Sequence, residues 1–267
     1  MVMRIHHLNC ISTCALGAAL MDGRGEGLRG RLACHCLLIE VGSQLVLVDT
    51  GFGLGDVARP HTRLAWPFRL LLRPQLRAEM TAARQIERLG LRRRDVRHIV
   101  VTHLDFDHAG GVLAGSWPEA VELAHPQTRV SVPEEAVALT LTPDTEQDSP
   151  ASHRLVTLLR DAGLLDTFAD GDEVAPGVRM RGAPGHRSGH SLVELGDEFM
   201  FLADTLHHAV HVQHPDWDTM FEDDVELSQR TRRGTIERVC DGPVLGASHI
   251  DGFGRITGGT APAWQVL

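Results

Sequence analysis

The chain contains four side chains that can bind a divalent metal ion within a stretch of six residues. They are His103, Asp105, Asp107 and His108. The cluster follows the β-branched residues 100–102 and precedes the pair Gly110-Gly111, as expected where a strand ends in a turn. Imidazoles and carboxylates at such a strand end lie at one rim of a sheet, where they can converge on a cation. The position of the cluster therefore favours a metal site over a chance grouping.

Three further candidate ligands come later in the chain. His186 lies in a turn rich in Gly and Pro, Asp204 ends an apolar run, and His249 ends another. At four places in the chain, then, a strand or a strand and its turn ends in a His or an Asp. This layout predicts one metal site that is assembled from distant parts of the chain.

The order and spacing of these residues resemble the metal signature of the metallo-β-lactamase-fold hydrolases. The segment Asp49-Thr50-Gly51, which follows the apolar run 44–48, is similar to an early strand and turn of the same superfamily. The resemblance extends over nearly the whole chain. It implies an α/β fold, a four-layer αββα sandwich of the metallo-β-lactamase type, as a single domain over residues 1–267.

The resemblance also implies which residues would bind metal. His103, Asp105 and His186 would hold a first ion, and Asp107, His108 and His249 would hold a second. Asp204 would bridge the two ions. Asp49 would brace the ligand loops through hydrogen bonds without touching metal.

The chain departs from the family pattern at Asp105, where most members carry His. A carboxylate at this place resembles the flavodiiron proteins, which use Glu, and the nuclease-like domain of bacterial DNA-uptake channels, which uses Asp. An oxygen ligand shifts the preference from zinc toward iron or manganese without excluding zinc. We therefore expect two divalent transition-metal ions, zinc first, with manganese or iron as alternatives.

Composition limits the partners that the protein could have. The 267 residues are 43% hydrophobic and 23% charged, as in an ordinary globular protein with a sizeable core. The net charge of −9 argues against nucleic acid as the main partner, because phosphate binding usually needs a basic surface. The basic run 92–94, with Arg97 nearby, is interpreted as a solvated helix end. A small-molecule substrate and a homodimer remain as expected partners.

The five cysteines and the first residues point to the cytoplasm. The number of cysteines is odd and no secretory signal is recognisable, so reduced thiols are expected. Cys34 and Cys36 share one face of an apparent strand, so burial explains them better than a second metal site. No apolar run approaches the roughly 20 residues of a membrane helix.

A coarse layout follows from periodicity and turn residues. We expect strands at 3–8 and 32–48 with a flexible Gly-rich loop at 23–27 between them, helices at 81–90 and from 109, and a strand around 121–124. An insertion-like region is expected at 133–170, with a helix at 152–162. A last helix is expected at 222–240, because its acidic start and basic end suit the helix dipole. The apolar segment 64–72 is either a helix packed on the core or across a dimer interface, or a lid over an apolar substrate.

Histidines are dense after Asp204. His207 and His208 follow it directly, so at least one should face the cleft as a partner of a metal ligand or as a donor to the substrate. His211 and His214 are expected on the surface. His190 is expected to orient its turn and not to bind metal.

The expected reaction is hydrolysis by a hydroxide that two ions share, with Asp204 as the bridge. Asp107 would orient the nucleophile and later carry a proton. Relatives of this length hydrolyse lactones, thioesters, β-lactams or organophosphate esters, and the quorum-quenching lactonases among them typically use a Tyr shortly after the bridging Asp. The chain contains no tyrosine, so His207 or His208 would have to substitute.

The expected substrate is a small, apolar ester or lactone, such as an acyl-homoserine lactone or an organophosphate ester. Three other classes stay open. They are a phosphodiesterase or nuclease of the same fold, an iron-dependent oxidoreductase of the flavodiiron or persulfide-dioxygenase type, and a non-catalytic binding module.

Overall fold

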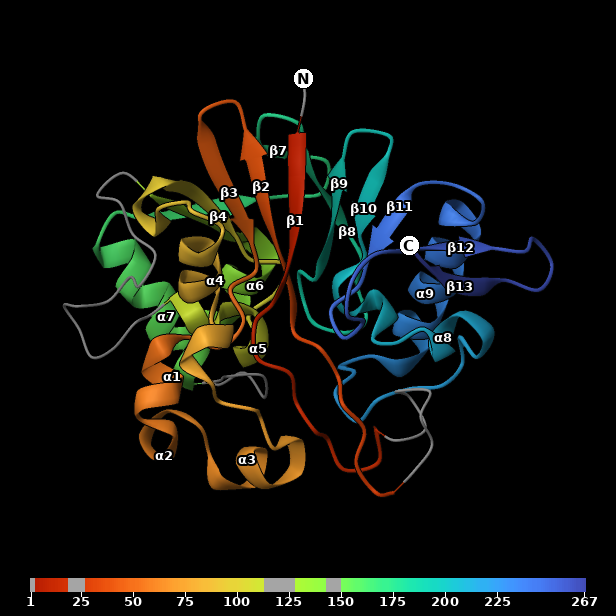
Figure 1. The fold of residues 1–267 in the computed structure, drawn as a ribbon, viewed down its shortest axis with the longest axis horizontal. Coiled ribbons are helices and arrows are strands. Elements are labelled where there is room, and N and C mark those ends of the chain that lie inside the picture. The colour runs from red at the N-terminus through yellow and green to blue at the C-terminus, as the bar shows by residue number, and fades with distance from the viewer. Residues whose placement is uncertain (1–2, 19–26, 113–127, 143–149) are drawn as a thin grey trace.

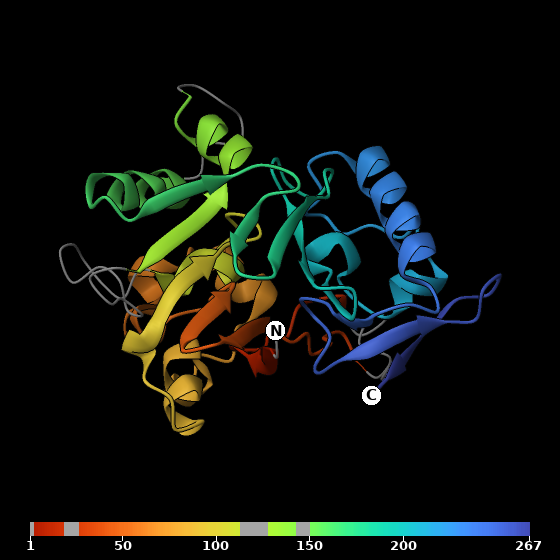
Figure 2. The same cartoon turned by 90° about the horizontal axis from the view of Figure 1, so that it is seen from above.

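Two β-sheets lie face to face in the computed structural model, which describes residues 3–18, 27–112, 128–142 and 150–267 (Figure 1). The first sheet has the strand order β1-β2-β3-β4-β5-β6, and the second has the order β13-β12-β11-β10-β9-β8-β7. Helices cover the outer face of each sheet, as the view from above in Figure 2 also shows. The layers run helix, sheet, sheet, helix. This arrangement confirms the expected αββα sandwich.

The elements have the following bounds. The strands of the first sheet are β1 (Met3–Asn9), β2 (His35–Val41), β3 (Gln44–Val48), β4 (Val96–Val100), β5 (Arg129–Pro133) and β6 (Leu165–Phe168). The strands of the second are β7 (Glu173–Ala175), β8 (Val178–Gly182), β9 (Ser191–Leu195), β10 (Phe199–Phe201), β11 (Val244–Gly246), β12 (Gly254–Thr257) and β13 (Ala263–Val266). The helices are α1 (Leu54–Ala58), α2 (Pro60–Arg63), α3 (Trp66–Leu72), α4 (Ala82–Arg88), α5 (Phe106–Ala109), α6 (Glu134–Thr140), α7 (Pro150–Asp161), α8 (Val210–Gln213) and α9 (Val225–Val239).

Alternating side chains of the central strands explain the layers. In β2, Leu37 and Ile39 face the second sheet, where they join side chains of β8, β9 and β10 in one apolar core. Leu38 points the other way, into a second core that α4, α6 and α7 close. A third core lies between the second sheet and the helices α8 and α9. The central strands of both sheets are therefore buried on both faces, which favours continuous apolar strands over alternating ones.

Most expected elements agree with the structure. The strand at 3–8, the helix at 81–90 and the helix at 152–162 correspond to β1, α4 and α7, and the segment 32–48 contains the hairpin of β2 and β3. The basic residues 92–94 are exposed, as expected. The short helix α5 ends at Ala109, where a helix was expected to begin; Gly110–Val112 form a 3-10 turn, and the rest of the expected helix lies outside the described residues. The strand expected around 121–124 and most of the loop at 23–27 lie outside the described residues.

Two expectations about the layout are wrong. Residues 133–170 are not an insertion, because β6 pairs parallel to β5 at the edge of the first sheet. Its four residues are too few to show a periodicity among the surrounding turn signals. The last helix does not begin at Glu222, because Asp224 is its N-cap and accepts a hydrogen bond from Leu227 N at 2.9 Å.

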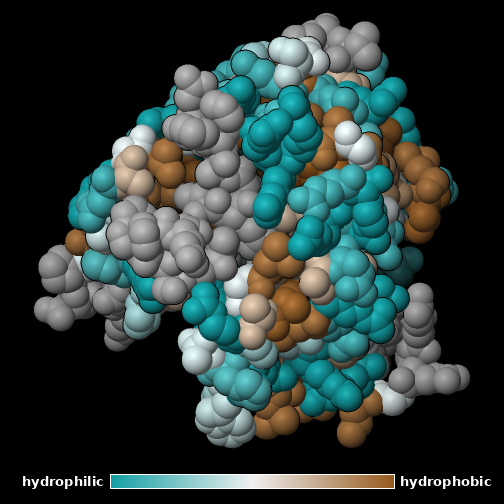
Figure 3. Space-filling view, turned by 60° about the vertical axis from the view of Figure 1, so that its left-hand side comes forward, coloured by the Kyte–Doolittle hydropathy of each residue, from teal (hydrophilic) through white to brown (hydrophobic). Residues whose placement is uncertain are grey.

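The surface carries scattered apolar side chains. On the face that Figure 3 shows, they emerge in small groups between hydrophilic ones. Trp66 and Leu70 of α3 are 67% and 56% exposed. Among the described residues, no helix is long and apolar enough to cross a membrane.

Candidate metal centre

The topology brings the candidate ligands to one edge of the sandwich. In the first sheet β3 and β4 are parallel neighbours, so Asp49 after β3 and His103 after β4 leave at the same edge. In the second sheet β10 and β11 are also parallel, which places Asp204 and His249 side by side. His186 comes from the turn between β8 and β9. Parallel strands end at a common edge, which explains how distant residues meet.

Local packing fixes the loops that carry these ligands. Gly111 lies against the turn after β3, and a Cβ atom here would stand 2.9 Å from the Thr50 carbonyl oxygen. Gly185 has a φ of +124°, and a Cβ atom here would stand 2.2 Å from Ser228 N. Only glycine permits both the conformation and the approach at residue 185. The glycines beside His108 and His186 therefore allow close packing around the centre.

Asp204 lies at the middle of the cluster. Its Oδ2 is 3.3 Å from His186 Nε2 and 3.7 Å from His249 Nε2, while its Oδ1 is 3.2 Å from His108 Nε2. The distance from Oδ2 to His103 Nε2 is 3.9 Å. Burial opposes ionisation, but the adjacent histidines, above all His108, hold the pKa of the Asp204 carboxyl well below its usual value.

The structure brings all seven predicted ligands together. The donor atoms of His103, Asp105 and His186 lie within 4.8 Å of one another, and so do those of Asp107, His108 and His249. These are the two triplets that the family resemblance implied, and Asp204 stands between them. Atoms that share one cation are roughly 3–3.5 Å apart when each bond is about 2.1 Å long. The spacing in the cluster is close to this.

The orientation of the rings also fits metal binding. The Nε2 atoms of His103, His108 and His186 are buried and have no hydrogen-bond partner. Their Nδ1 atoms are anchored by Thr102 Oγ1 at 3.0 Å, Asp49 Oδ2 at 2.8 Å and Glu222 Oε2 at 3.3 Å. His249 Nδ1 is anchored by the Ala33 carbonyl at 2.8 Å. An anchored Nδ1–H leaves the Nε2 lone pair for a cation, so the donor set fits two divalent ions.

Asp49 has the bracing position that the sequence predicted. Its carboxylate accepts hydrogen bonds from Thr102 N at 2.8 Å and Thr102 Oγ1 at 2.9 Å, besides facing His108 Nδ1. The residue is fully buried and has a φ of +55°. A left-handed conformation at a buried Asp is held by these contacts. Asp49 thus links the ends of β3 and β4 to the ligand helix α5.

An apolar cavity of about 570 Å³ opens onto the cluster. Its base contains Asp105, Asp107, His186, Asp204, His207 and His249. Its walls are largely apolar and include Leu16, Leu32, Phe106, Met220 and Phe221. Helix α3 contributes Phe68, Leu71 and Leu72, so part of the segment 64–72 lines the cavity.

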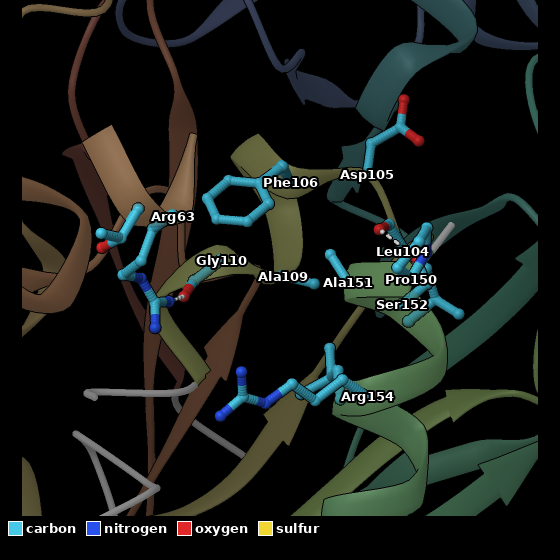
Figure 4. Close-up of a pocket in the computed structure, with 12 residues that line it drawn as sticks. Arg63, Leu104, Asp105, Phe106, Ala109, Gly110, Pro150, Ala151, Ser152 and Arg154 are labelled. Carbon is cyan, nitrogen blue, oxygen red and sulfur yellow. Dashed lines mark hydrogen bonds between the residues drawn. The ribbon is translucent and has the colours of Figure 1, made fainter. Parts of the chain in front are cut away.

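A second hollow of about 400 Å³ lies on the other side of Phe106. Figure 4 shows Arg63 and Arg154 at its border and the Asp105 carboxylate pointing away from it. Arg63 is paired with Asp56 at 2.5 Å and donates to the Gly110 carbonyl at 3.3 Å. The candidate ligands other than Asp105 do not line this hollow, so the chemistry belongs to the larger cavity.

Comparison with known proteins identifies the family. The family model of the metallo-beta-lactamase superfamily matches residues 29–241, well over half of the chain. The chain belongs to the metallo-β-lactamase superfamily. It is 39% identical over 197 residues to proteins of Mycobacterium tuberculosis and Mycobacterium bovis, each described as a "probable metallo-hydrolase", with 72% of this chain and 57% of each relative covered. The matched part is thus little more than half of these relatives' length.

Solved structures of the superfamily share the fold. AidC, a dizinc quorum-quenching lactonase in complex with a product, superposes with a TM-score of 0.75 at 17% identity, covering 99% of this chain and 94% of that one. An N-acyl homoserine lactone hydrolase with N-hexanoyl-L-homoserine at its catalytic metal centre gives a TM-score of 0.70 at 20% identity, covering 93% and 94%. These matches confirm the fold expected from the sequence, and their low identity says nothing about the substrate of this superfamily member.

Two charged residues at the site escaped the sequence analysis. Arg187 Nε donates to Asp105 Oδ1 at 2.8 Å, and its NH1 donates to Asp223 Oδ1 at 3.0 Å. Burial opposes ionisation of Asp105, but His103, His186 and Arg187 hold the pKa of its carboxyl well below the usual value. Arg187 therefore offsets the extra negative charge that Asp105 brings to this centre. Its place next to His186 in the sequence was the available signal.

Glu222 is the second residue that the analysis missed. Its side chain is fully buried and accepts hydrogen bonds from Ser228 Oγ at 2.8 Å and Arg232 NH2 at 3.2 Å, besides facing His186 Nδ1. Burial opposes ionisation, but the hydrogen bond with His186 and the neighbouring charges lower the pKa of Glu222 to about 2. The acidic run 222–224 suggested only a helix start, which hid this role.

The additional histidines differ in place and role. His207 lines the cavity, with Nε2 at 3.2 Å from Asp204 Oδ2, whereas His208 is not among the described lining residues. His190 Nε2 accepts a hydrogen bond from Asp204 N, so this lone pair is not free to bind metal. This agrees with the expectation that His190 orients its turn and does not bind metal. His214 is exposed as expected. The surface prediction for His211 is wrong: it is 1% exposed, because α8 turns it toward His207.

The cysteines near the centre are packing residues. Cys34 and Cys36 are both buried, at 3% and 0% exposure, as their shared strand face predicted. Burial raises the pKa of the Cys36 thiol well above its usual value, so it stays protonated and is a poor metal ligand. Cys34 Sγ lies 2.9 Å from the Asp107 carbonyl oxygen and supports the ligand loop.

Proposed function

We propose that this chain is a hydrolase of small, apolar esters or lactones that uses two divalent ions. The observation that carries the proposal is the convergence of seven candidate metal ligands, five of which line a cavity with apolar walls. The named relatives are metallo-hydrolases, and two similar folds are lactonases whose product contains an acyl chain. A medium-length acyl chain would find room in about 570 Å³.

His103, Asp105 and His186 would hold one ion, Asp107, His108 and His249 the other, and Asp204 would bridge them. When bound, two such ions supply a hydroxide near neutral pH and an acceptor for the oxyanion charge. We expect zinc in this site, with manganese or iron as alternatives that the Asp105 oxygen ligand favours.

The side chains of the protein then have separate tasks. Asp107 lines the cavity, and it would orient the nucleophile and return a proton to the leaving group. Phe68, Leu71 and Phe106 would bind the acyl portion and exclude water from the reacting carbonyl. Asp204 lies between the two groups of ligands and would hold them at a fixed separation.

The cavity does not favour a phosphodiester substrate. Arg187 is the single Lys or Arg among the described residues that line it, and two carboxylates, those of Asp105 and Asp223, already engage this side chain. Recognition of a nucleic acid backbone usually requires several basic side chains. A neutral ester or lactone therefore agrees better with the walls.

The test begins with elemental analysis of protein saturated with zinc, manganese or iron(II). We expect about two ions per chain. Each loaded form is then assayed against acyl-homoserine lactones of increasing chain length, aryl esters, a phosphotriester and a phosphodiester. Hydrolysis of lactones or esters that a chelator abolishes and added metal restores would support the proposal. Cleavage of the phosphodiester alone, or one ion per chain at saturation, would refute it.

A further inference from the structure

His207 points its Nε2 at the Asp204 carboxylate, as the predicted metal-binding histidines His186 and His249 do. Its ring is 4% exposed, and its Nε2 faces Asp204 Oδ2 at 3.2 Å, closer than His249 Nε2 at 3.7 Å. The donor atoms of His186, Asp204 and His207 form a compact group within 4.8 Å. His207 therefore lies on the side of Asp204 where the first ion would be held.

Glu222 lies behind His186 and His207 at the same time. Its Oε2 is 3.3 Å from His186 Nδ1, and its Oε1 is 3.8 Å from His207 Nδ1. Arg232 and Ser228 hold the carboxylate in place from α9. The carboxylate therefore anchors the His186 ring by a hydrogen bond, whereas His207 Nδ1 lies near it without a hydrogen-bond partner.

We infer that His207 is an additional protein ligand of the first metal ion, beside His186, which Glu222 positions. The inference rests on the proposed two-metal function and specifies the ligand set of that site. The first ion would then have three nitrogen ligands, from His103, His186 and His207, and two oxygen ligands, from Asp105 and Asp204. Five protein ligands suit manganese or iron(II), which accept six, better than a four-coordinate structural zinc.

The alternative role for His207 is to protonate the leaving group. A neutral ring carries one proton, so a His207 that binds an ion through Nε2 carries its proton on Nδ1, on the side of Glu222, and has no proton at Nε2 to give. His190 shows the contrast. Its Nδ1 lies 2.9 Å from the Ala183 carbonyl and its Nε2 is occupied by Asp204 N, so it is excluded as a ligand. His207 Nε2 instead faces the Asp204 carboxylate at 3.2 Å, where an ion could lie.

The test measures the metal and not the reaction. Wild-type protein, His207→Ala, the volume-preserving His207→Gln and Glu222→Gln are loaded with Co²⁺, and the visible absorption and the affinity in chelator competition are recorded. His214→Ala is the matched control, because His214 is exposed and stacks on Trp217 at a ring distance of 4.2 Å. Circular dichroism confirms that each variant is folded.

We expect both His207 variants to lose more than about 100-fold in affinity for one of the two ions, and Glu222→Gln about 10–100-fold, as for loss of a partner behind a ligand. The absorption of the remaining first-site ion should change in intensity. Imidazole added to His207→Ala should restore the wild-type spectrum, because the vacated ring position borders the cavity. The control should match wild type.

Wild-type affinities and spectra in both His207 variants, with a loss of turnover alone, would overturn the inference and assign His207 to proton transfer. The same spectra in Glu222→Gln and wild type would remove the positioning role of Glu222. A wild-type protein that binds two ions but hydrolyses no ester or lactone would refute the proposed function and leave this test of the ligand set intact.

Discussion

Replacing Arg232 by Met should remove most of the stability of this fold. Arg232 is the largest fully buried side chain among the described residues. Its Nε donates to the Thr205 carbonyl at 3.0 Å, and its NH1 donates to the carbonyls of Pro215 at 2.8 Å and Trp217 at 2.7 Å. Its NH2 contacts Glu222 at 3.2 Å. The residue after Asp204 and the loop before α9 are thus held by one guanidinium.

The magnitude follows from these contacts. Breaking a buried ion pair by removing one partner costs about 3–5 kcal/mol, because the other charge stays buried. Three carbonyl oxygens that lose their donor add at least about 1 kcal/mol each. The sum is about 6–8 kcal/mol before relaxation, which is comparable with the total stability of about 5–15 kcal/mol of a typical domain.

The assay is urea unfolding followed by circular dichroism on chelator-treated protein. The free energy of unfolding should fall by at least about 4 kcal/mol in Arg232→Met. It should fall less in Arg232→Lys, which keeps the charge but has fewer hydrogen-bond donors. Arg233→Met is the matched control. Arg233 pairs with Asp216 on the surface, so its loss should cost less than about 1 kcal/mol.

The double variant Arg232→Met with Glu222→Gln separates the two contributions. Neutralising the stranded carboxylate should recover about 1–3 kcal/mol relative to Arg232→Met alone. A loss below about 1 kcal/mol for Arg232→Met with an unchanged urea dependence would refute the reasoning. The reasoning would also be refuted if the double variant lost as much free energy of unfolding as Arg232→Met and Glu222→Gln lose together.

Three further predictions concern the centre itself. Asp105→His should move the preference toward zinc while the protein still binds metal through His103 and His186, and identical zinc–manganese competition in both proteins would exclude Asp105 as a ligand. Asp204→Ala should release one ion and lower hydrolysis at neutral pH by several orders of magnitude, and a variant with two ions and normal turnover would contradict the bridging role. Glu222 has a pKa of about 2 against an ordinary 4.5, so its stabilising contribution is complete above pH 4.5 and is lost as the pH falls toward 2. The stability gap between wild type and Glu222→Gln in urea should therefore narrow from pH 5 to pH 3, and a constant gap would show that Glu222 is not ionised in the fold.

The candidate ligands could be found in the sequence because each has a local signal. His103, Asp204 and His249 each follow a short apolar run, and the fold aligns the ends of parallel strands at one edge. About ten consecutive residues of sequence are enough to recognise a short apolar strand that ends in a His or an Asp. The resemblance to a family then supplied the global pairing that local patterns cannot give.

Glu222 and Arg232 could not be predicted, because their partners are set by tertiary packing. A charged residue before or within a helix is usually solvated, and the acidic run 222–224 matched a helix start. Only the position of α9 against the turn that carries His186 buries them. Likewise, β6 is defined by its pairing with β5 and not by its own four residues.

The anchors behind the ligands show how the fold and the centre depend on each other. Thr102 and Asp49, which orient His103 and His108, belong to the first sheet, whereas Glu222 is held by α9 on the second. Asp204 comes from the second sheet but contacts histidines from both. The relative position of the two sheets therefore sets the distances within the ligand set, so a change that loosens the core between the sheets should weaken metal binding even when every ligand and every anchor is intact.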